Sequence, residues 1–267
     1  MAENWLNLSN QIVIVTGGSS GIGESIVKEL LTQGVKVVNA DIHSGKTEHE
    51  NLFYVKTDVS SKADIDNLVQ KVTEKYGKID GLVNNAGINI PKLLVDAVDS
   101  DSKHEADEKS FDKMLNINQK GLFLLSQAVG KIFVNQKYGV IINMSSESGL
   151  EGSEGQSIYA ATKAALNSFT RSWAKELGKY NIRVVGVAPG IMEETGLRTI
   201  EYETALSYTR GISIDQLREG YSKTTVIPLN RSGKLHEVAD FVCYLLSEKA
   251  SYITGVTYNI SGGKTRG

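Results

Sequence analysis

The chain has 267 residues, 40% of them hydrophobic and 22% charged, and a formal net charge of −2 at pH 7. This length suits one domain with a sizeable core, and the small net charge gives no electrostatic reason to expect a nucleic acid or a membrane as partner. The N-terminal residues lack a basic segment followed by an apolar one, and no run approaches the ~18 apolar residues that cross a bilayer. We therefore predict a single domain over residues 1–267, located in the cytoplasm and without a membrane anchor.

The cysteine and histidine content argues against an internal disulfide and against a metal site. Cys243 is the only cysteine and lies in the apolar helical stretch 238–246, so it has no disulfide partner and is predicted to be buried. The four histidines are His43, His49, His104 and His236. Their positions show none of the spacings typical of metal ligands, and we expect no bound metal.

Short apolar runs alternate with segments of helical periodicity along most of the chain. The predicted strands lie near 11–16, 35–40, 52–55, 79–84, 139–144, 182–188 and 256–260. The predicted helices include 21–33, 62–76, 110–136, 158–179 and 235–247. This alternation predicts an α/β fold, a doubly wound seven-stranded parallel sheet with helices on both faces. Ligands of such sheets bind outside the carboxyl ends of the strands.

The first predicted strand is followed at once by a glycine-rich turn and then by a helical pattern. In a strand, turn and helix of this kind, glycines let the backbone approach a pyrophosphate, and the helix N-terminus attracts its charge. The spacing Gly-x-x-x-Gly-x-Gly differs from the commoner dinucleotide fingerprint. We predict a cofactor loop that comprises Gly17, Ser19, Ser20, Gly21, Ile22 and Gly23.

An acidic residue closes the second predicted strand. Asp41 stands about 20 positions past the glycines, where a carboxylate can accept hydrogen bonds from both ribose hydroxyls of an adenosine. The same charge would repel a 2′-phosphate, and neither Ser19 and Ser20 nor Ile42 and His43 supply a cation to attract one. Asp41 therefore favours NAD as the cofactor, although a turn residue at a strand end is the alternative interpretation.

Tyr159 and Lys163 lie four residues apart, a spacing that places both on one face of a helix. A cation beside a phenol stabilises the phenolate and lowers the pKa of the phenol from about 10. Tyr159 could then exchange a proton with a substrate hydroxyl. Taken alone, the pair could also be two surface residues.

Together with the glycine turn, this pair makes the chain resemble the short-chain dehydrogenase/reductase family over nearly its whole length. The resemblance implies a Rossmann-type fold with NAD bound along the glycine turn. It also implies that residues 84–87 steady the sheet near the adenine ring, that residues 58–59 contact adenine, and that residues 189–195 lie beside the nicotinamide. The further cofactor residues implied are Asp58, Val59, Asn85, Ala86, Gly87, Tyr159, Lys163, Pro189, Gly190 and Thr195.

The same resemblance implies the catalytic residues of a hydride transfer. Ser146 would hydrogen-bond the substrate oxygen, Tyr159 would act as the general acid or base, and Lys163 would lower the pKa of the tyrosine and bind the nicotinamide ribose. Asn118 would hold a water that links Lys163 to solvent. Ser145 matches the serine position of the family less well than Ser146 does. Asn116 is a competing candidate for the asparagine position that is assigned to Asn118.

The interval 191–231 is long and mixes aromatic with cationic residues, which predicts a substrate lid. Together with the C-terminal end, it looks closest to bacterial members of the family that oxidise sorbitol 6-phosphate with NAD to fructose 6-phosphate. The candidate cations for a phosphate are Arg198, Arg210, Lys223, Lys264 and Arg266. The candidates for the substrate hydroxyls are Glu151, Glu193 and Asn89.

Other interpretations stay open on the sequence. The same catalytic residues would serve an unphosphorylated polyol, acetoin or a 3-oxoacyl thioester, and a protein of another class would sense NAD without catalysis. The resemblance implies a homotetramer built through 110–136 and 158–179, with 256–260 at a second interface. The acidic segment 96–108 is expected to be an exposed loop without assigned chemistry.

Overall fold

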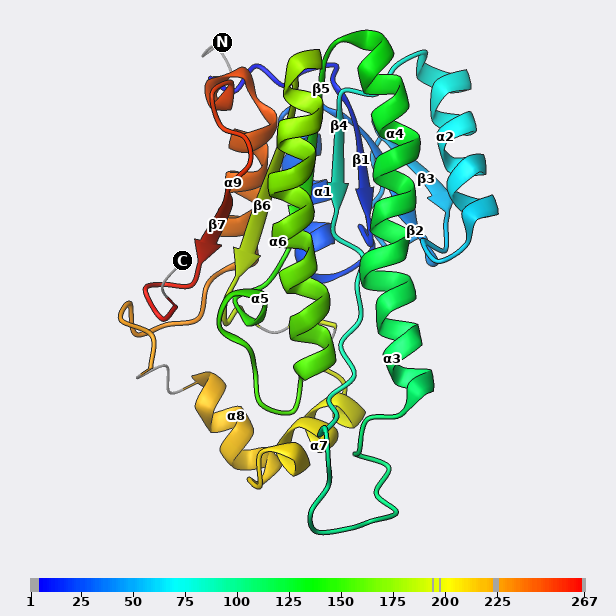
Figure 1. Cartoon of the computed structure of the whole chain (residues 1–267). Coiled ribbons are helices and arrows are strands. Elements are labelled where there is room, and N and C mark those ends of the chain that lie inside the picture. The colour runs from blue at the N-terminus through cyan, green and yellow to red at the C-terminus, as the bar shows by residue number, and fades with distance from the viewer. Residues whose placement is uncertain (1–4, 194, 197, 223–225, 266–267) are drawn as a thin grey trace.

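The structure is a computed structural model that describes residues 5–193, 195–196, 198–222 and 226–265. Its centre is one seven-stranded sheet in the order β3-β2-β1-β4-β5-β6-β7, and each pair of neighbouring strands is parallel (Figure 1). The strands are β1 (Ile12–Thr16), β2 (Lys36–Asp41), β3 (Leu52–Lys56), β4 (Gly81–Asn84), β5 (Gly139–Met144), β6 (Ile182–Pro189) and β7 (Thr257–Ile260). The predicted fold class is confirmed.

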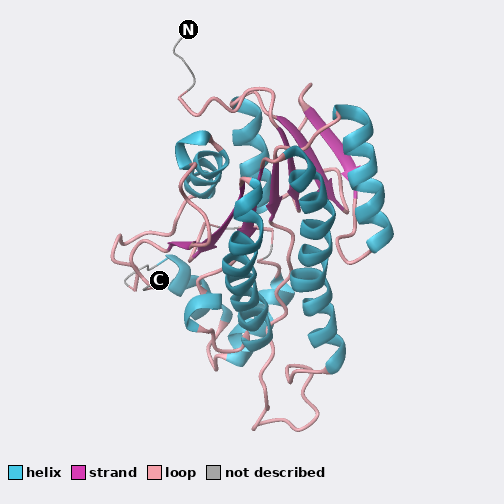
Figure 2. Cartoon of the chain, turned by 45° about the horizontal axis from the view of Figure 1, so that its top comes forward, coloured by secondary structure: helices cyan, strands magenta, loops and turns pink. Residues whose placement is uncertain are grey.

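Helices cover both faces of the sheet (Figure 2). The α-helices are α1 (Gly21–Thr32), α2 (Lys62–Tyr76), α3 (Glu108–Leu115), α4 (Leu122–Gln136), α5 (Ser148–Glu151), α6 (Ser157–Leu177), α7 (Ile200–Thr209), α8 (Ile214–Ser222) and α9 (Leu235–Leu246). Shorter helical turns are the π turn η1 (Asn116–Gly121) and the 3₁₀ turns η2 (Gly178–Tyr180) and η3 (Glu248–Ala250). Helices α1 and α9 pack on one face, and α2, α4 and α6 pack on the other.

The apolar strands are explained by burial on both faces of the sheet. Along β1, Val13 and Val15 contact the cluster that includes α1 and α9, whereas Ile12 and Ile14 contact the cluster that includes α2 and α4. Alternate residues of a strand point to opposite faces, so every position of a strand covered on both sides favours an apolar side chain. Cys243 is fully buried in the first cluster, as predicted.

The predicted helix 110–136 is in fact two α-helices joined by the π turn. Helix α3 begins after Asp107, whose carboxylate accepts a hydrogen bond from the Ser110 N–H at 2.7 Å. A π turn inserts an extra residue into the helical repeat and often occurs at functional sites. Here it carries Asn118, which is almost completely buried.

The prediction that 96–108 is an exposed loop is wrong for part of the segment. Val98 is 92% exposed, but Asp96 is only 6% exposed and accepts a 2.6 Å hydrogen bond from the hydroxyl of Tyr208 on α7. The His104 ring stacks on the Tyr208 ring at a centroid distance of 4.2 Å. This loop is therefore attached to α7, a contact between residues 112 positions apart.

Helices α7 and α8 lie beyond the edge of the sheet toward which the strands point (Figure 1). They belong to the interval 191–231, for which the sequence predicted no helices. The apolar residues of α7 do not gather on one face, which explains why its helical periodicity is weak. Within the described ranges of the chain, no helix has both the length and the apolar character that crossing a bilayer requires.

Candidate active site

Two cavities meet at the carboxyl edge of the sheet. The first, the glycine-loop cavity, has a volume of about 350 Å³, and the second, the outer cavity, about 640 Å³. They share the lining residues Ile22, Ser145, Tyr159, Pro189 and Thr195. Tyr159 therefore stands at the boundary between a cavity that follows the glycine turn and one that faces α7 and α8.

Most residues predicted to bind the cofactor line the glycine-loop cavity. They are Gly17, Ser20, Gly21, Ile22, Gly23, Asp41, Asp58, Val59, Asn85, Ala86, Gly87, Tyr159, Lys163, Pro189 and Thr195. Ser19 and Gly190 do not line it. Ser19 contacts Asp41 behind the turn, and Gly190 lines the outer cavity.

The glycine turn requires its glycines for two physical reasons. Gly17 and Gly21 have φ of +63° and +55°, a conformation that side chains with a Cβ rarely adopt. A Cβ on Gly23 would lie 2.0 Å from the Gly17 carbonyl oxygen. Ser20, the N-cap of α1, makes no side-chain capping bond, so backbone N–H groups at the helix start are available to an anion. The turn therefore fits a pyrophosphate.

Asp41 is held in place at the end of β2. Its carboxylate accepts hydrogen bonds from the N–H of Ser19 and the N–H of His43, both at 3.1 Å. Among the described residues that line the glycine-loop cavity, Lys163 is the only lysine or arginine. The end of the cavity at Asp41 thus presents a carboxylate and no described cation.

Asn85 clamps the ends of β1 and β4 together. Its side-chain amide donates to the carbonyl oxygens of Thr16 and Gly17 at 3.0 and 3.1 Å. The Thr16 hydroxyl in turn accepts from the N–H groups of Asn85 and Ala86, both at 3.0 Å. These four hydrogen bonds link protein groups only. They therefore hold this part of the glycine-loop cavity in place without a ligand.

Helix α6 and the end of β5 bring three catalytic candidates together. Tyr159 and Lys163 lie one turn apart on α6, and the Lys163 Nζ is 5.7 Å from the centre of the Tyr159 ring. Ser146 follows β5 and hydrogen-bonds the Tyr159 hydroxyl. The Ser145 hydroxyl instead donates to the backbone oxygen of Lys163 at 3.0 Å, which ties β5 to α6. Of the two serines, Ser146 is the one whose side chain reaches the tyrosine.

The electrostatics of this group differ from the prediction. Burial raises the pKa of Tyr159, and the hydrogen bond from Ser146 opposes that rise. Burial also lowers the pKa of Lys163 to about 8. The Lys163 ammonium donates to the Met144 carbonyl oxygen at 2.7 Å. The predicted lowering of the Tyr159 pKa is therefore wrong for this structure, in which the effect of burial outweighs that of the hydrogen bond from Ser146.

Asn118 joins the π turn to the rest of the site. Its Oδ1 accepts from the Ile88 N–H at 2.9 Å, and its Nδ2 donates to the Ile88 oxygen at 2.8 Å and to Thr162 Oγ1 at 3.1 Å. A Cβ on Gly87 would lie 3.3 Å from Asn118 Oδ1 and 3.5 Å from Lys163 Nζ, so both polar atoms border the same small space. The competing candidate Asn116 is exposed and lines neither cavity.

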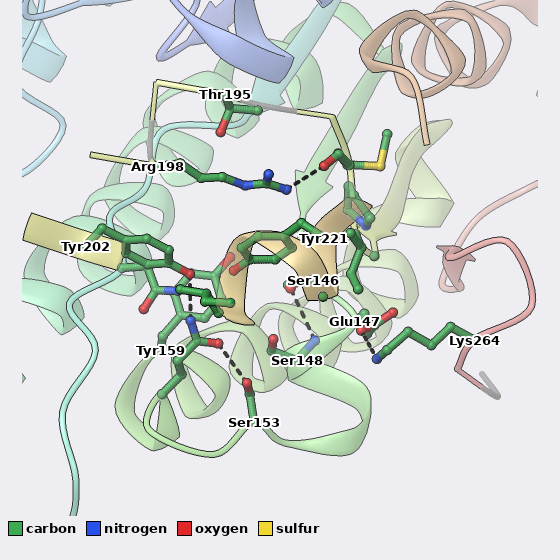
Figure 3. A pocket seen from close by; sticks show the side chains of 18 of the residues that line it. Ser146, Glu147, Ser148, Ser153, Tyr159, Thr195, Arg198, Tyr202, Tyr221 and Lys264 are labelled. Carbon is green, nitrogen blue, oxygen red and sulfur yellow. Dashed lines mark hydrogen bonds and ion pairs between the residues drawn. The ribbon is translucent and has the colours of Figure 1, made fainter. Parts of the chain in front are cut away.

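The outer cavity contains most of the predicted substrate contacts (Figure 3). Its lining includes Asn89, Glu151, Glu193, Arg198, Arg210 and Lys264. The candidates Lys223 and Arg266 lie outside the described residues. Glu193 accepts from the N–H of Leu235 at 2.9 Å and from Lys234 at 3.1 Å, so it caps α9 and has a structural role.

Sequence reasoning missed several polar residues of this cavity. Glu147 follows Ser146 directly and forms an ion pair with Lys264, which also contacts Glu151 at 2.9 Å. Gln156, almost completely buried, donates to the Tyr202 hydroxyl at 2.8 Å. The position of Glu147 beside the predicted serine was the only signal that could have identified it.

A glycine turn at the start of α1, a carboxylate at the end of β2 and a tyrosine, lysine and serine between two cavities together define a dinucleotide-dependent oxidoreductase. Residues 11–205 match the family model described as short chain dehydrogenase, and the chain belongs to this family. A sorbitol-6-phosphate 2-dehydrogenase from Klebsiella pneumoniae is 63% identical to it over 267 residues, which cover 99% of this chain and 100% of that protein.

A more distant relative and a solved structure also match nearly the whole chain. A 3-oxoacyl-(acyl-carrier-protein) reductase from Thermotoga maritima is 35% identical over 97% of this chain and 99% of that protein. The crystal structure of 3-ketoacyl-(acyl-carrier-protein) reductase from Brucella melitensis complexed with NADH superposes with a TM-score of 0.80 and 28% identity, covering 97% of this chain and 100% of that one. The family uses NAD or NADP.

Proposed function

We propose that this chain is an NAD-dependent sorbitol-6-phosphate 2-dehydrogenase, which interconverts sorbitol 6-phosphate and fructose 6-phosphate. The observation that carries the proposal is the 63% identity, over the whole length of both chains, to the Klebsiella pneumoniae enzyme of that name. The geometry supports it, because Tyr159 and Ser146 line a cavity of about 640 Å³ whose lining includes charged and hydroxyl-bearing side chains, which suits a small hydroxylated substrate.

NAD, when bound, would accept the hydride from the alcohol carbon. The residues that would hold it are the glycine turn 17–23 for the pyrophosphate, Asp41 for the adenosine ribose, and Lys163 for the nicotinamide ribose. The Asp41 carboxylate supports NAD over NADP, since it would repel a 2′-phosphate and no described cation of this cavity lies there to attract one.

The protein residues handle the substrate proton. Ser146 would orient the substrate oxygen by a hydrogen bond, and Tyr159 would take the hydroxyl proton in oxidation or return it in reduction. Lys163, with a pKa of about 8, would transfer the proton onward. A water in the small space beside Gly87, between Lys163 Nζ and Asn118 Oδ1, would complete the path.

A spectrophotometric screen tests the function. The purified protein should reduce NAD with sorbitol 6-phosphate far faster than it reduces NADP, and faster than with sorbitol, mannitol 1-phosphate or acetoin. Tyr159→Phe should lower turnover by at least about 1,000-fold, since it removes the proton-transfer group, while NADH binding stays within about twofold.

Two outcomes of the screen would overturn the proposal. Faster turnover of an unphosphorylated polyol, acetoin or a 3-oxoacyl substrate would assign a different dehydrogenase. The absence of any absorbance change across the panel, with NADH binding retained, would favour a protein that senses NAD without catalysis.

We also propose that the protein assembles as a homotetramer through α4 and α6, with β7 at a second interface. Support comes from an aromatic cluster on α4 and α6, in which the Phe169 and Trp173 rings stack at 4.8 Å and Phe123 is 39% exposed. The same helices border a hollow of about 540 Å³. The interval 191–231, whose helices α7 and α8 border the outer cavity, is proposed to act as the substrate lid.

A further inference from the structure

The charges that line the outer cavity are divided unevenly. Its lysine is paired with carboxylates, because Lys264 contacts both Glu147 and Glu151. Its two arginines, Arg198 and Arg210, have no carboxylate partner among the described residues. Since arginine stays ionised throughout the accessible pH range, Arg198 and Arg210 are charged groups of this cavity that no adjacent described carboxylate offsets.

Arg198 is held in a fixed orientation. Its guanidinium carbon lies 3.8 Å from the centre of the Tyr221 ring, and one of its nitrogens donates to the Met192 carbonyl oxygen at 2.7 Å. Stacking fixes the plane of the guanidinium and leaves its remaining N–H groups in that plane. Figure 3 shows the side chain beside Tyr221, away from the Glu147–Lys264 pair.

Arg210 is anchored to the other lining residues by a polar chain. It donates to the Ser153 hydroxyl at 3.4 Å, Ser153 donates to Gln156 at 2.7 Å, and Gln156 donates to the Tyr202 hydroxyl at 2.8 Å. Tyr202 and Tyr221, on which Arg198 stacks, both line the outer cavity, and Figure 3 shows their side chains next to each other. The two arginines thus border one region around Tyr202 and Tyr221.

The arginines serve the substrate side of the site. Both line the outer cavity, and neither lines the glycine-loop cavity. The other described cation of the outer cavity is a poor site for a dianion, because the carboxylates of Glu147 and Glu151 next to Lys264 would repel it. A planar guanidinium, in contrast, can donate two parallel hydrogen bonds to phosphate oxygens.

We propose that Arg198 and Arg210 bind the phosphate group of the substrate and thereby select phosphorylated over free polyols. This assignment rests on the proposed function and adds to it the residues that recognise the phosphate. Glu147 and Lys264, on the other side of the cavity, then face the hydroxyl-bearing part of the substrate.

Single replacements Arg198→Gln and Arg210→Gln test the assignment, with Arg231→Gln as the matched control. Arg231 belongs to the same interval but is exposed, pairs with Glu237 and lines neither cavity. Each variant is compared with the wild type by kcat/KM for sorbitol 6-phosphate and for sorbitol, by calorimetric binding of fructose 6-phosphate to the NADH complex, and by the NADH dissociation constant.

Each of the two arginine variants should lose about 10- to 100-fold in kcat/KM for sorbitol 6-phosphate, mainly through KM, and a similar factor in fructose 6-phosphate affinity. Turnover of sorbitol and NADH binding should stay within about twofold, and Arg231→Gln should match the wild type. Arg198→Lys should retain part of the phosphate preference, because it keeps the charge but loses the planar donors.

Equal losses for both substrates, or none for sorbitol 6-phosphate, would overturn the assignment while leaving the proposed function intact. Loss of NADH binding in the arginine variants would also overturn it, since it would mean that these residues support the fold or the cofactor. A wild type that neither oxidises nor binds any phosphorylated sugar would overturn the proposed function and the phosphate assignment together.

Discussion

Lys163 is a buried cation with no carboxylate partner among the described residues. It is 5% exposed, and the hydrogen bond of its ammonium goes to the Met144 carbonyl oxygen. Burial disfavours the charged form and lowers the pKa to about 8 from an ordinary 10.5. Burial of Lys163 therefore lowers the free energy of unfolding, a cost that accompanies its proposed role in proton transfer.

The sign of this effect gives a prediction. Between pH 8 and 10.5 the unfolded chain binds more protons at Lys163 than the folded chain, so its destabilising contribution is full below pH 8 and fades as pH rises to 10.5. Lys163→Met should therefore raise the free energy of unfolding at pH 7 by about 1–3 kcal/mol, and by less at pH 10. Urea denaturation at the two pH values measures this.

Lys175 supplies the control for that experiment, because it is exposed on the same helix α6. Lys175→Met should change stability by less than about 0.5 kcal/mol at either pH. Two results would contradict the prediction: a Lys163→Met variant that is less stable than the wild type at pH 7, or a gain in the free energy of unfolding that is the same at both pH values. Either would mean that burial of the Lys163 charge does not destabilise the fold.

At the scale of single elements, the connection from β1 to α1 depends on close contact between backbone atoms. Gly23 lies in the first turn of α1 against the carbonyl oxygen of Gly17, the residue that follows β1. A side chain at position 23 would separate the strand end from the helix start, and the backbone N–H groups would no longer converge on one anion.

Gly23→Ala should therefore weaken NADH binding by at least about 10-fold, because a Cβ 2.0 Å from an oxygen forces the turn to open. Fluorescence titration with NADH measures this. Gly178→Ala is the control, since Gly178 has helical φ and ψ and a Cβ there would meet no described atom within 4 Å. Unchanged NADH affinity in Gly23→Ala would show that the turn does not hold the dinucleotide.

At the scale of the whole molecule, helices α4 and α6 are the proposed interface between subunits. They form the outer layer of one face of the sheet in Figure 1. The ring of Phe123 on α4 packs against those of Phe169 and Trp173 on α6, at 6.4 Å between centroids in both pairs. Phe123 is exposed and the other two rings are half-buried, and a partly exposed aromatic cluster of this kind is typical of a protein–protein interface.

A homotetramer should have about four times the chain mass of 29.0 kDa in light scattering after size-exclusion chromatography. Trp173→Glu should dissociate it, because a carboxylate would be buried at the interface. Val98→Glu is the control, since Val98 is 92% exposed on the 96–108 loop. A monomeric wild type, or a Trp173→Glu variant of unchanged mass, would contradict the proposed interface.

The fold could be predicted because its signals are local. Each strand is a short apolar run, and the turn, Asp41 and the Tyr159–Lys163 pair each lie within or directly beside one predicted element. What the sequence could not give are contacts between distant residues, such as Lys264 with Glu147, 117 positions apart. The π turn was also missed, because one extra residue barely alters the periodicity of a long helix.

The ion pair between Lys264 and Glu147 has a practical consequence for handling the protein. It places Lys264 against Glu147, the residue that follows Ser146, so an alteration of the chain close to Lys264 would act on the outer cavity. Trp5, the first residue that the structure describes, stacks on Tyr244 of α9, and neither residue lines one of the two cavities. A tag for kinetic work therefore belongs on the Trp5 side of the chain, not on the Lys264 side.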